Sequence, residues 1–543
     1  MPHRSDFRGI AVLLLTVLTG VACGDDRPKV VPVASTTSAN AKAQSLARVI
    51  DEALGKKWAA ETVEPASLCT DAEFCRRVWL DIGGKIPPVA EVHAFLADTR
   101  ADKRQRLVEQ LLDSPSYVTH FTTVWRTALL PEVDADLQAR ALLPAFEAWL
   151  RQKLTDDASH ADIVRDVLTT SLNGQDTGGA FQPGKQLRPT AFYQVKQLKP
   201  ENLAAGTARV FLGVRIECAQ CHDHPFDTWK REQFWSYAAF FAGIERQEQD
   251  NVLGQIRELF DRQTLQIPGT KTTVSAAWLD GTKPESFRAG PRVVLADWML
   301  SPKNPYVARA AVNRLWAQFF GLGIVHPVDD FSSQNPPSHP ELLDELARQF
   351  VESGYSAKFV IRALTSSHAY QLSAATPGGT SPPDVRLFAR MPVKGLTPEQ
   401  IFDSLAQATG FYRPFNGREA LEFGNTTPRD EFLEMFANTS DTPTERTTTI
   451  LQALAMMNGQ FVGEATGLEK SATLSAIADF PAMTTAERLE ALYFASVSRP
   501  PRPEELAKLV SYVDEGGPTK DPRSALSDVF WALLNSSEFL FNH

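Results

Sequence analysis

The sequence predicts a mostly α-helical protein with two helical domains, a short β-containing insert between them, and a disordered tether at the N-terminus. Apolar residues recur at helical spacing through most of the chain. Proline and glycine interrupt this spacing repeatedly, most cleanly at Pro87-Pro88. Residues 264–278 instead combine β-branched side chains with a glycine and a proline, which predicts a hairpin or small sheet.

The places where these patterns change predict the domain boundaries. A chain of 543 residues is too long for a single hydrophobic core, so more than one domain is expected. We divide the chain into a lipoprotein-type signal peptide at 1–23, a flexible tether at 24–45, a helical domain at 46–245, a linker or small β insert at 246–288, and a C-terminal helical domain at 289–543.

The composition is that of an ordinary globular protein with an acidic surface. Hydrophobic residues make up 43% of the chain and charged residues 22%. The chain has 55 Lys and Arg against 65 Asp and Glu, which gives a net charge of −10. Nucleic acid is therefore not expected as a partner, because binding its phosphates needs a basic face.

The first residues predict export and attachment to a membrane through a lipid. Arg4 and Arg8 precede the apolar run 10–18, and small residues lead to Cys23. A cysteine at this place predicts lipid on Cys23 after cleavage, although Gly20 stands where an aliphatic residue is usual; plain secretion is the alternative. The apolar run is too short to span a bilayer. The expected location is the bacterial cell envelope, in the periplasm or on the outer membrane.

The first helical domain contains a series of short predicted helices. Pro200 opens one of them, which runs to about Phe211 and leads the chain towards Cys218. A further helix at 229–241 is rich in aromatic residues, which suit either a haem face or the protein core. Four other stretches have apolar residues at helical spacing: Asp71–Leu80, Val89–Leu96, Asp102–Leu112 and Leu143–Leu154.

The C-terminal domain is also predicted to be helical. Ser338 is a suitable N-cap for a helix over 341–352. The helical pattern continues from Thr397 to the C-terminus, with a polar loop predicted at 425–446. Other helices are expected at 292–300, 305–320 and 357–366.

One helical module occurs at both ends of the chain. Residues 76–121 run helix, Pro-Pro, helix, and then Leu-Leu-Asp-Ser-Pro. Residues from 499 to 543 follow a helix with Pro-Pro, a helix, and then Leu-Leu-Asn-Ser-Ser. Two copies are too few for a solenoid. They predict an all-α architecture in which the two terminal modules pack near each other.

The strongest chemical motif is Cys218-Ala219-Gln220-Cys221-His222. In an exported protein, C-x-x-C-H predicts covalent attachment of haem c through Cys218 and Cys221, with His222 as the proximal iron ligand. The chain shows no methionine loop of the kind that supplies a distal ligand, so His326 and His339 are the candidates for that position.

The same residues allow two other interpretations. The imidazole and carboxylate groups of His222, His224 and Asp227, with His339, can ligate a divalent metal, and Asp223 and the two thiolates add further ligands. Alternatively, Cys218 and Cys221 form a disulfide that staples a turn. The three interpretations remain open from the sequence alone.

The remaining polar motifs predict structure. Cys69 and Cys75 flank a helix start and are expected to form a local disulfide. Asp329-Asp330 is expected to ligate a cation or, more in keeping with its helical surroundings, to pair with Arg314 in a buried brace. The sequence contains no G-x-S-x-G, H-E-x-x-H, phosphate loop or dinucleotide fingerprint, so whether the protein is an enzyme stays undecided.

Several motifs together resemble a known pair of domains. These motifs are Cys218 to Trp229, Asn313 to Trp316 with Phe320-Gly321, Asp329 to Phe331, Pro336 to Leu343, and Leu534 to Ser536. They are similar to the planctomycete secreted cytochrome-like domain followed by its companion planctomycete secreted domain. The resemblance covers nearly everything after the tether. It implies no activity, because both domains are of unknown function.

Two functions are therefore expected from different classes. The first is redox or electron transfer through haem c on Cys218 and Cys221, with a redox partner in the envelope. The second is a non-enzymatic structural or binding lipoprotein, in which the cysteine pair is a disulfide or metal staple and the helical faces recognise an envelope protein.

Overall fold

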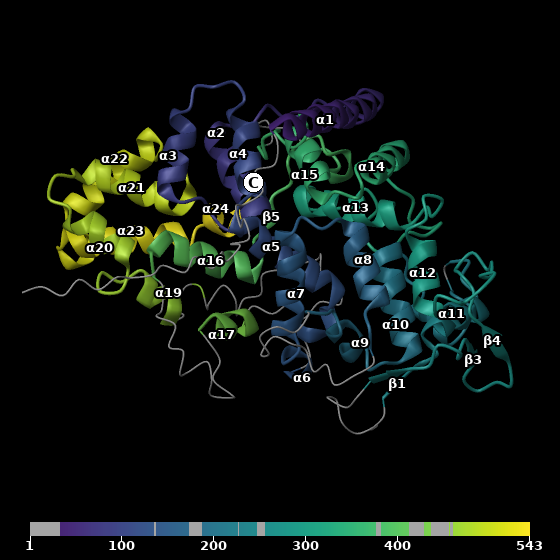
Figure 1. Cartoon of the computed structure of the whole chain (residues 1–543). Helices are drawn as coiled ribbons and strands as arrows, with labels where there is room; N and C mark the ends of the chain where they lie inside the picture. Colours follow the sequence, from purple (N-terminus) through teal and green to yellow (C-terminus); the bar gives the residue numbers. More distant parts are fainter. Residues whose placement is uncertain are drawn as a thin grey trace, which may run out of the picture.

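The computed structural model describes residues 33–134, 137–172, 187–225, 227–246, 256–375, 382–411, 428–435, 456 and 460–543. These residues fold into many short helices and three small antiparallel strand pairs (Figure 1), which confirms the predicted mostly α-helical class. The predicted signal peptide and its Cys23 lie outside the described residues. No described helix has the length and apolar character that crossing a membrane requires.

Helix α1 (Val33–Glu61) begins inside the stretch predicted as a flexible tether. Its apolar residues at 46, 50 and 54 are fully buried, because they recur every four residues and form one face. This face packs on α15 (Ala357–Ser366) and α14 (Pro340–Glu352), as Figure 1 shows. The Trp58 indole donates to Leu387 O at 2.7 Å, which fixes the C-terminal end of α1. The part of the tether that the structure describes is therefore helical.

The N-terminal module follows α1 and has its predicted order of helices. Thr70 caps α2 by accepting from Glu73 N at 3.2 Å, and Ser114 caps α5 by accepting from Tyr117 N at 3.3 Å. α2 continues into a wider π-helical turn, η1, before Pro87-Pro88 starts the next helix. The bounds are α2 Asp71–Val78, η1 Trp79–Gly83, α3 Val89–Ala97, α4 Lys103–Leu112 and α5 Pro115–Leu129.

The rest of the first predicted domain leads to the C-x-x-C-H motif and then to two hairpins. β1 (Ile244–Arg246) pairs with β2 (Ile256–Glu258), and β3 (Thr264–Gln266) pairs with β4 (Thr273–Ser275). The second hairpin confirms the β insert that the sequence predicted. The helices are η2 Pro131–Asp134, α6 Leu137–Arg140, α7 Leu143–Thr155, α8 His160–Thr169, α9 Ala191–Val195, α10 Pro200–Thr207, η4 Ala208–Leu212, η5 Glu217–Gln220, α11 Arg231–Ala238 and η6 Ala239–Phe241.

The C-terminal half is helical as predicted, with two local differences. α14 begins at Pro340 with His339 at its N-cap, because Ser338 donates its amide and hydroxyl to Ile324 O instead of capping the helix. α17 forms a helix within the predicted loop 425–446. The remaining elements are α12 Pro291–Met299, α13 Val307–Phe320, η7 Val385–Leu387, β5 Lys394–Gly395, α16 Pro398–Thr409, α17 Pro428–Met435, α19 Gln460–Ala465, α20 Ala472–Asp479, α21 Thr485–Val497, α22 Pro503–Asp514, η9 Gly517–Thr519, α23 Pro522–Leu534, α24 Ser537–Leu540 and β6 Phe541–Asn542.

The hydrophobic cores do not divide at the predicted boundary. One core runs from Ala43 to Met391 and crosses the β insert without a break. The second lies in the C-terminal helices from Leu396 to Phe539, and Leu80 and Ile86 of the N-terminal module also contribute to it. The larger core therefore spans the predicted linker, and Phe494 of α21 also belongs to it.

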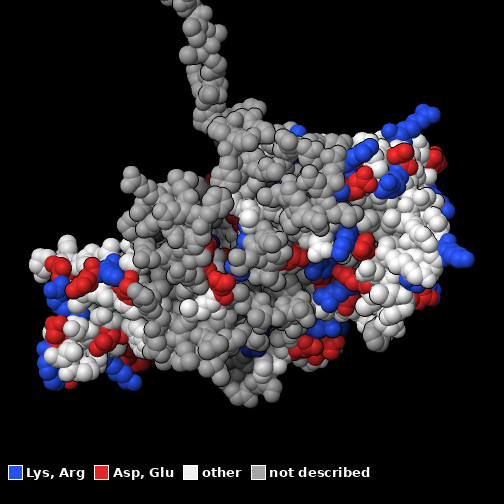
Figure 2. Space-filling model, turned by 90° about the horizontal axis from the view of Figure 1, so that it is seen from below, with Lys and Arg blue, Asp and Glu red and all other residues white. Residues whose placement is uncertain are grey.

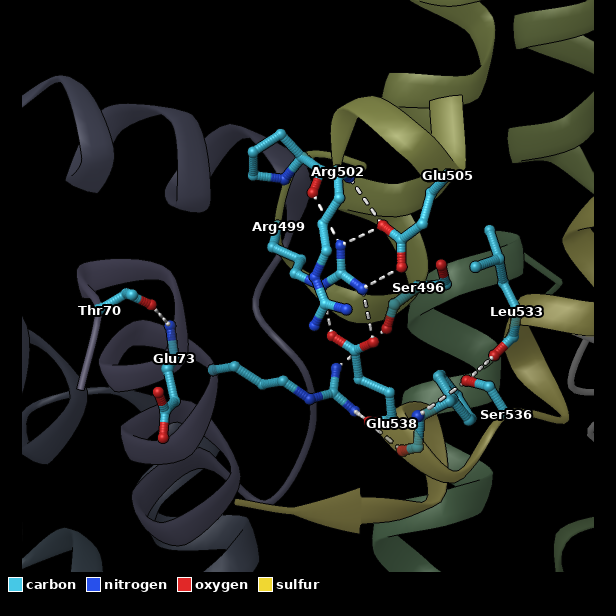
Figure 3. Close-up of polar contacts among 12 residues, drawn as sticks. Thr70, Glu73, Ser496, Arg499, Arg502, Glu505, Leu533, Ser536 and Glu538 are labelled. Carbon is cyan, nitrogen blue, oxygen red and sulfur yellow. Dashed lines mark hydrogen bonds and ion pairs between the residues drawn. The ribbon is translucent and has the colours of Figure 1, made fainter. Parts of the chain in front are cut away.

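The two terminal modules pack against each other, as the internal repeat predicted (Figure 1). Arg76 is buried and donates to three carbonyl oxygens, those of Ser496, Glu538 and Phe539, at 3.0, 3.0 and 2.8 Å. In the same region, the Arg499 guanidinium binds the carboxylates of Glu505 and Glu538 (Figure 3). Arg77 donates to His543 O at 3.0 Å. The module at residue 76 thus anchors the last helix and the C-terminal residue.

A buried carboxylate joins three distant segments. Asp81 of η1 accepts from Lys394 Nζ at 2.6 Å, from the Tyr370 hydroxyl at 2.8 Å, and from Asn542 Nδ2 at 2.8 Å. Lys394 and Asn542 lie on the paired strands β5 and β6, where Lys394 is opposite Asn542. Burial raises the pKa of Asp81, while Lys394 and the hydrogen bonds act in the opposite direction. This network holds the C-terminal strand against the N-terminal module.

The charges on the surface are mixed. On the face in Figure 2, Lys and Arg alternate with Asp and Glu wherever the described residues are visible. The described part of this face therefore shows no uniformly basic patch.

Candidate functional site

The C-x-x-C-H motif lies on a surface turn between η4 and α11. Its middle residues hold the turn in place: Ala219 is fully buried, and Gln220 O accepts from the Trp235 indole at 3.0 Å and from Arg231 Nε at 3.3 Å. Cys218 and Cys221 are both exposed. Cys218 lies in η5 and Cys221 is its C-cap, so both thiols lie on the same exposed turn.

The imidazole of His222 is held in one tautomer. Its Nδ1 lies 2.7 Å from the carbonyl oxygen of Asp223. A carbonyl oxygen can only accept, so in the neutral ring Nδ1 carries the proton and Nε2 keeps its lone pair. A histidine whose other nitrogen donates to a backbone carbonyl is the usual arrangement at a metal centre. His222 is thus prepared to offer Nε2 to a metal or an iron.

Asp223 stabilises this turn through its side chain. Its carboxylate accepts from Arg231 N and from Lys230 Nζ, each at 3.0 Å. The backbone amide of Arg231, followed by Lys230, lowers the pKa of Asp223. This carboxylate sits at the N-terminus of α11, where a negative charge is favoured. Asp223 therefore fixes the position of the carbonyl that orients His222.

The predicted metal ligands do not come together. His224 N donates to Trp229 O at 2.8 Å, and Asp227 Oδ1 accepts from Thr228 N at 2.7 Å, so both residues belong to the turn that follows the motif. Within the part of the chain that the structure describes, no three His, Cys, Asp or Glu side chains form a metal-binding group. The described geometry does not support the predicted divalent metal set.

His339 lies elsewhere in the fold. Its ring packs on Phe388 with centroids 5.8 Å apart, and its Nδ1 is 3.0 Å from the Ser338 hydroxyl. Burial lowers the pKa of His339 to about 4, and the positive charges of Lys57 and Arg386 lower it further. These neighbours belong to α1 and η7, not to the turn at 217–227. His339 is therefore a buried residue at the start of α14, and the prediction that it joins the motif is not supported.

The aromatic helix beside the motif belongs to the core. Phe234, Trp235 and Tyr237 of α11 are 4% exposed or less. Tyr237 also shares a buried hydrogen bond with Thr207 of α10, at 3.1 Å. Of the two interpretations that the sequence left open, the structure selects the core helix over a haem face.

A loop from the C-terminal half reaches the motif from the other side. Phe331 N donates to Gly213 O at 2.8 Å, and Arg215 donates to Asp329 Oδ1 through Nε at 3.0 Å and NH2 at 2.7 Å. Gly213 has a φ of +70°, and a Cβ there would lie 2.7 Å from the Phe331 ring. The predicted brace therefore exists, but Asp329 pairs with Arg215 rather than with Arg314.

Arg215 and Glu217 are the site residues that the sequence did not single out. Arg215 pairs with a residue 114 positions away, so no local pattern marks it. Burial raises the pKa of the Glu217 carboxyl, while Arg209 and Arg215 act against this increase. The only feature of the sequence that could have marked Arg215 and Glu217 is that they lie within three residues of Cys218.

All four described cysteines are free thiols. Cys69 precedes the cap of α2, whereas Cys75 lies inside that helix and is fully buried. The two thiols are not joined in the structure, so the predicted Cys69–Cys75 disulfide is absent from it. Burial raises the pKa of Cys75 to about 12, as expected for an inert core thiol.

The fold and the motif define a mostly helical protein with an exposed dithiol–histidine turn, braced by a loop from its second half. Residues 49–246 match the family model PSCyt2, described as a protein of unknown function (DUF1549). Residues 291–513 match PSD1, likewise described as a protein of unknown function (DUF1553). The chain therefore belongs to the proteins that carry these two domains in tandem, as the resemblance implied. No curated protein and no solved structure matches it.

Proposed function

We propose that this chain is an exported redox protein of the bacterial cell envelope. In this proposal Cys218 and Cys221 would hold haem c covalently and His222 would ligate its iron. The observation that supports it best is the contact of His222 Nδ1 with Asp223 O, which leaves Nε2 free to ligate iron. A c-type haem supplies one-electron transfer when it is bound.

The donor set fits such a group. Cys218 and Cys221 are exposed and unpaired at η5 and its C-cap, so both sulfur atoms are accessible for thioether bonds. Ala219 and Gln220 anchor the turn in the protein interior, and Asp223 holds the carbonyl that orients the imidazole. The protein's part in the reaction is therefore to tether the group through the two cysteines, to orient the His222 imidazole, and to hold the proton on its Nδ1.

The exposure of the motif bears on the partner. The aromatic rings of α11 are already buried in the core, so they would not enclose a haem held on this turn, and its edge would stay exposed. An exposed edge suits exchange of electrons with another protein by transient contact. We propose that this partner is a redox protein of the same compartment, and that a lipid on Cys23 holds the chain at the membrane.

The direct test is the covalent attachment of haem. The full chain, with its export signal, is expressed in a host that matures c-type cytochromes, and its absorbance and haem-stained denaturing gel are recorded. A Soret band and a stained protein band are expected for the wild type, and no stain is expected for Cys218→Ala or Cys221→Ala. Cys69→Ala is the matched control, because Cys69 lies outside the turn. A colourless wild-type protein contradicts the proposal.

The exposed thiol pair also supports a second candidate, a structural or binding lipoprotein of the envelope with a disulfide staple. Cys218 and Cys221 are both free and exposed on the same short turn, where oxidation could join them. Counting thiols by alkylation with and without reductant separates the two candidates, since reductant releases two thiols from a disulfide and none from haem thioethers. The lipid anchor is tested by comparing the membrane and soluble fractions of the wild type and a Cys23→Ser variant. If the wild type is found in the soluble fraction as much as the variant, the anchor is contradicted.

A further inference from the structure

Two arginine side chains near the C-x-x-C-H turn are not hydrogen-bonded to any other residue that the structure describes. Arg209 lies on η4 and Arg314 on α13, and these two helices pack against each other. Both side chains are partly buried. Among the described residues, neither guanidinium makes a hydrogen bond or an ion pair. η4 is also a π-helical turn, a distortion that occurs frequently at functional sites.

Three other arginines in the described structure bind protein groups directly, although Arg76 Nε itself has no partner. Arg76 donates to three carbonyl oxygens, Arg292 binds Glu258 and two carbonyls, and Arg362 binds Glu109 through three hydrogen bonds. This is the expected pattern, because a buried cation without hydrogen bonds destabilises the fold. Arg209 and Arg314 differ from these arginines because neither makes a hydrogen bond within the described structure. Both lie where η4 packs against α13.

The groups around the two arginines do not neutralise them. Burial is the main cause that lowers the pKa of Arg314, Arg209 lowers it further, and Asp329 opposes the decrease. Asp329, however, already binds Arg215 through two hydrogen bonds to one oxygen. His160 and Lys196 are the next titratable groups, and both are potential cations: the first lies near Arg314 and the second near Arg209.

Carboxylates in reach of Arg209 are also limited. Glu217 is close enough to interact with Arg209 electrostatically, but it also interacts with Arg215 and makes no hydrogen bond to Arg209. Glu132 binds Lys196 Nζ at 3.1 Å. Both guanidinium groups thus keep donors that no protein carboxylate or carbonyl uses.

We propose that Arg209 and Arg314 together bind an oxyanion, the carboxylate or phosphate group of a small ligand. The guanidinium fork matches both kinds of group through paired N–H···O bonds. The ligand would lie where η4 meets α13, beside the C-x-x-C-H turn and the loop that carries Asp329. This site is separate from the thiols and imidazole of the proposed redox function, and it does not depend on haem.

The test measures binding of two simple probes, inorganic phosphate and acetate, to the full purified chain by isothermal titration calorimetry at constant ionic strength. Saturable binding of at least one probe is expected. Arg209→Gln and Arg314→Gln are each expected to weaken it by roughly tenfold or more, the loss that accompanies one charge-assisted hydrogen bond. Preference for phosphate or for acetate identifies the ligand group.

Arg309→Gln is the matched control. Arg309 lies on the same helix but pairs with Asp344 at 2.5 Å, so its loss should leave anion binding unchanged. The proposal is overturned if neither probe binds the wild type, or if both arginine variants bind as tightly as the wild type. Haem content is measured on the same samples. A protein without haem that still binds the anion contradicts the proposed redox function and leaves this inference standing.

Discussion

Replacing Asp81 with Asn is expected to destabilise the contact between the two terminal modules. The substitution keeps the shape of the side chain but removes the charge that faces Lys394 Nζ at 2.6 Å. Lys394 is only 15% exposed at its side chain and Asp81 only 3%, so water replaces little of the lost interaction. Removing one partner of a buried ion pair costs about 3–5 kcal/mol, because the other charge stays buried without compensation.

Two features of the site bear on this magnitude. Lys394 retains bonds to the carbonyl oxygens of Gln318 and Phe319, at 3.1 and 2.7 Å, which soften the loss. Burial also lowers the pKa of Lys394, so the lysine can release its proton instead of remaining charged. We therefore expect a loss near the lower end, about 3 kcal/mol. In Asp81→Asn with Lys394→Met, part of this loss should be recovered, because no unpaired charge remains.

The assay is chemical denaturation followed by tryptophan fluorescence, together with hydrogen exchange of the strand pair β5–β6. The variant should unfold at lower denaturant concentration, and the amide of Leu396, which donates to Leu540 O, should exchange faster. Asp98→Asn is the control, since Asp98 pairs with Arg100 at the surface. A loss below about 1 kcal/mol with unchanged exchange would refute the reasoning that Asp81 joins the modules.

Three further predictions concern other parts of the fold. Burial, followed by the charge of Arg314, lowers the pKa of His160 to about 4. The stability that neutral His160 contributes is therefore full above its unfolded pKa of about 6.5 and is lost as the pH falls towards 4. His160→Gln should make the melting temperature less dependent on pH across this range. Gly213→Ala should lower the free energy of unfolding by about 1–3 kcal/mol and reduce haem attachment, because the added Cβ would lie 2.7 Å from the Phe331 ring. A variant as stable as the wild type would contradict that packing. Arg499→Lys should lower the free energy of unfolding by about 1 kcal/mol, measured by thermal melting, because an ammonium cannot bind the carboxylates of Glu505 and Glu538 in paired geometry. An unchanged melting temperature would show that these paired bonds do not stabilise the fold.

Helices were the part of the structure that local sequence described best. Proline at a first turn, a hydroxyl at the cap and apolar residues at helical spacing act within a few residues, so α4 and α15 appear close to their expected bounds. The residue that caps a helix was harder to predict where another group competed for the hydrogen bonds of the candidate side chain. Ser338 has the right side chain and place for a cap, yet Ile324 O takes both of its donors.

The sequence by itself determined the helical class, the repeated terminal module, the β insert and the C-x-x-C-H turn, because each of these depends on neighbouring residues. The tertiary structure alone decided the partners. It placed Asp329 on Arg215 across 114 residues, separated His339 from the motif, left Cys69 and Cys75 unpaired, and brought Arg209 beside Arg314. Such contacts depend on how helices pack, and a side chain's own neighbours in sequence carry no record of that packing.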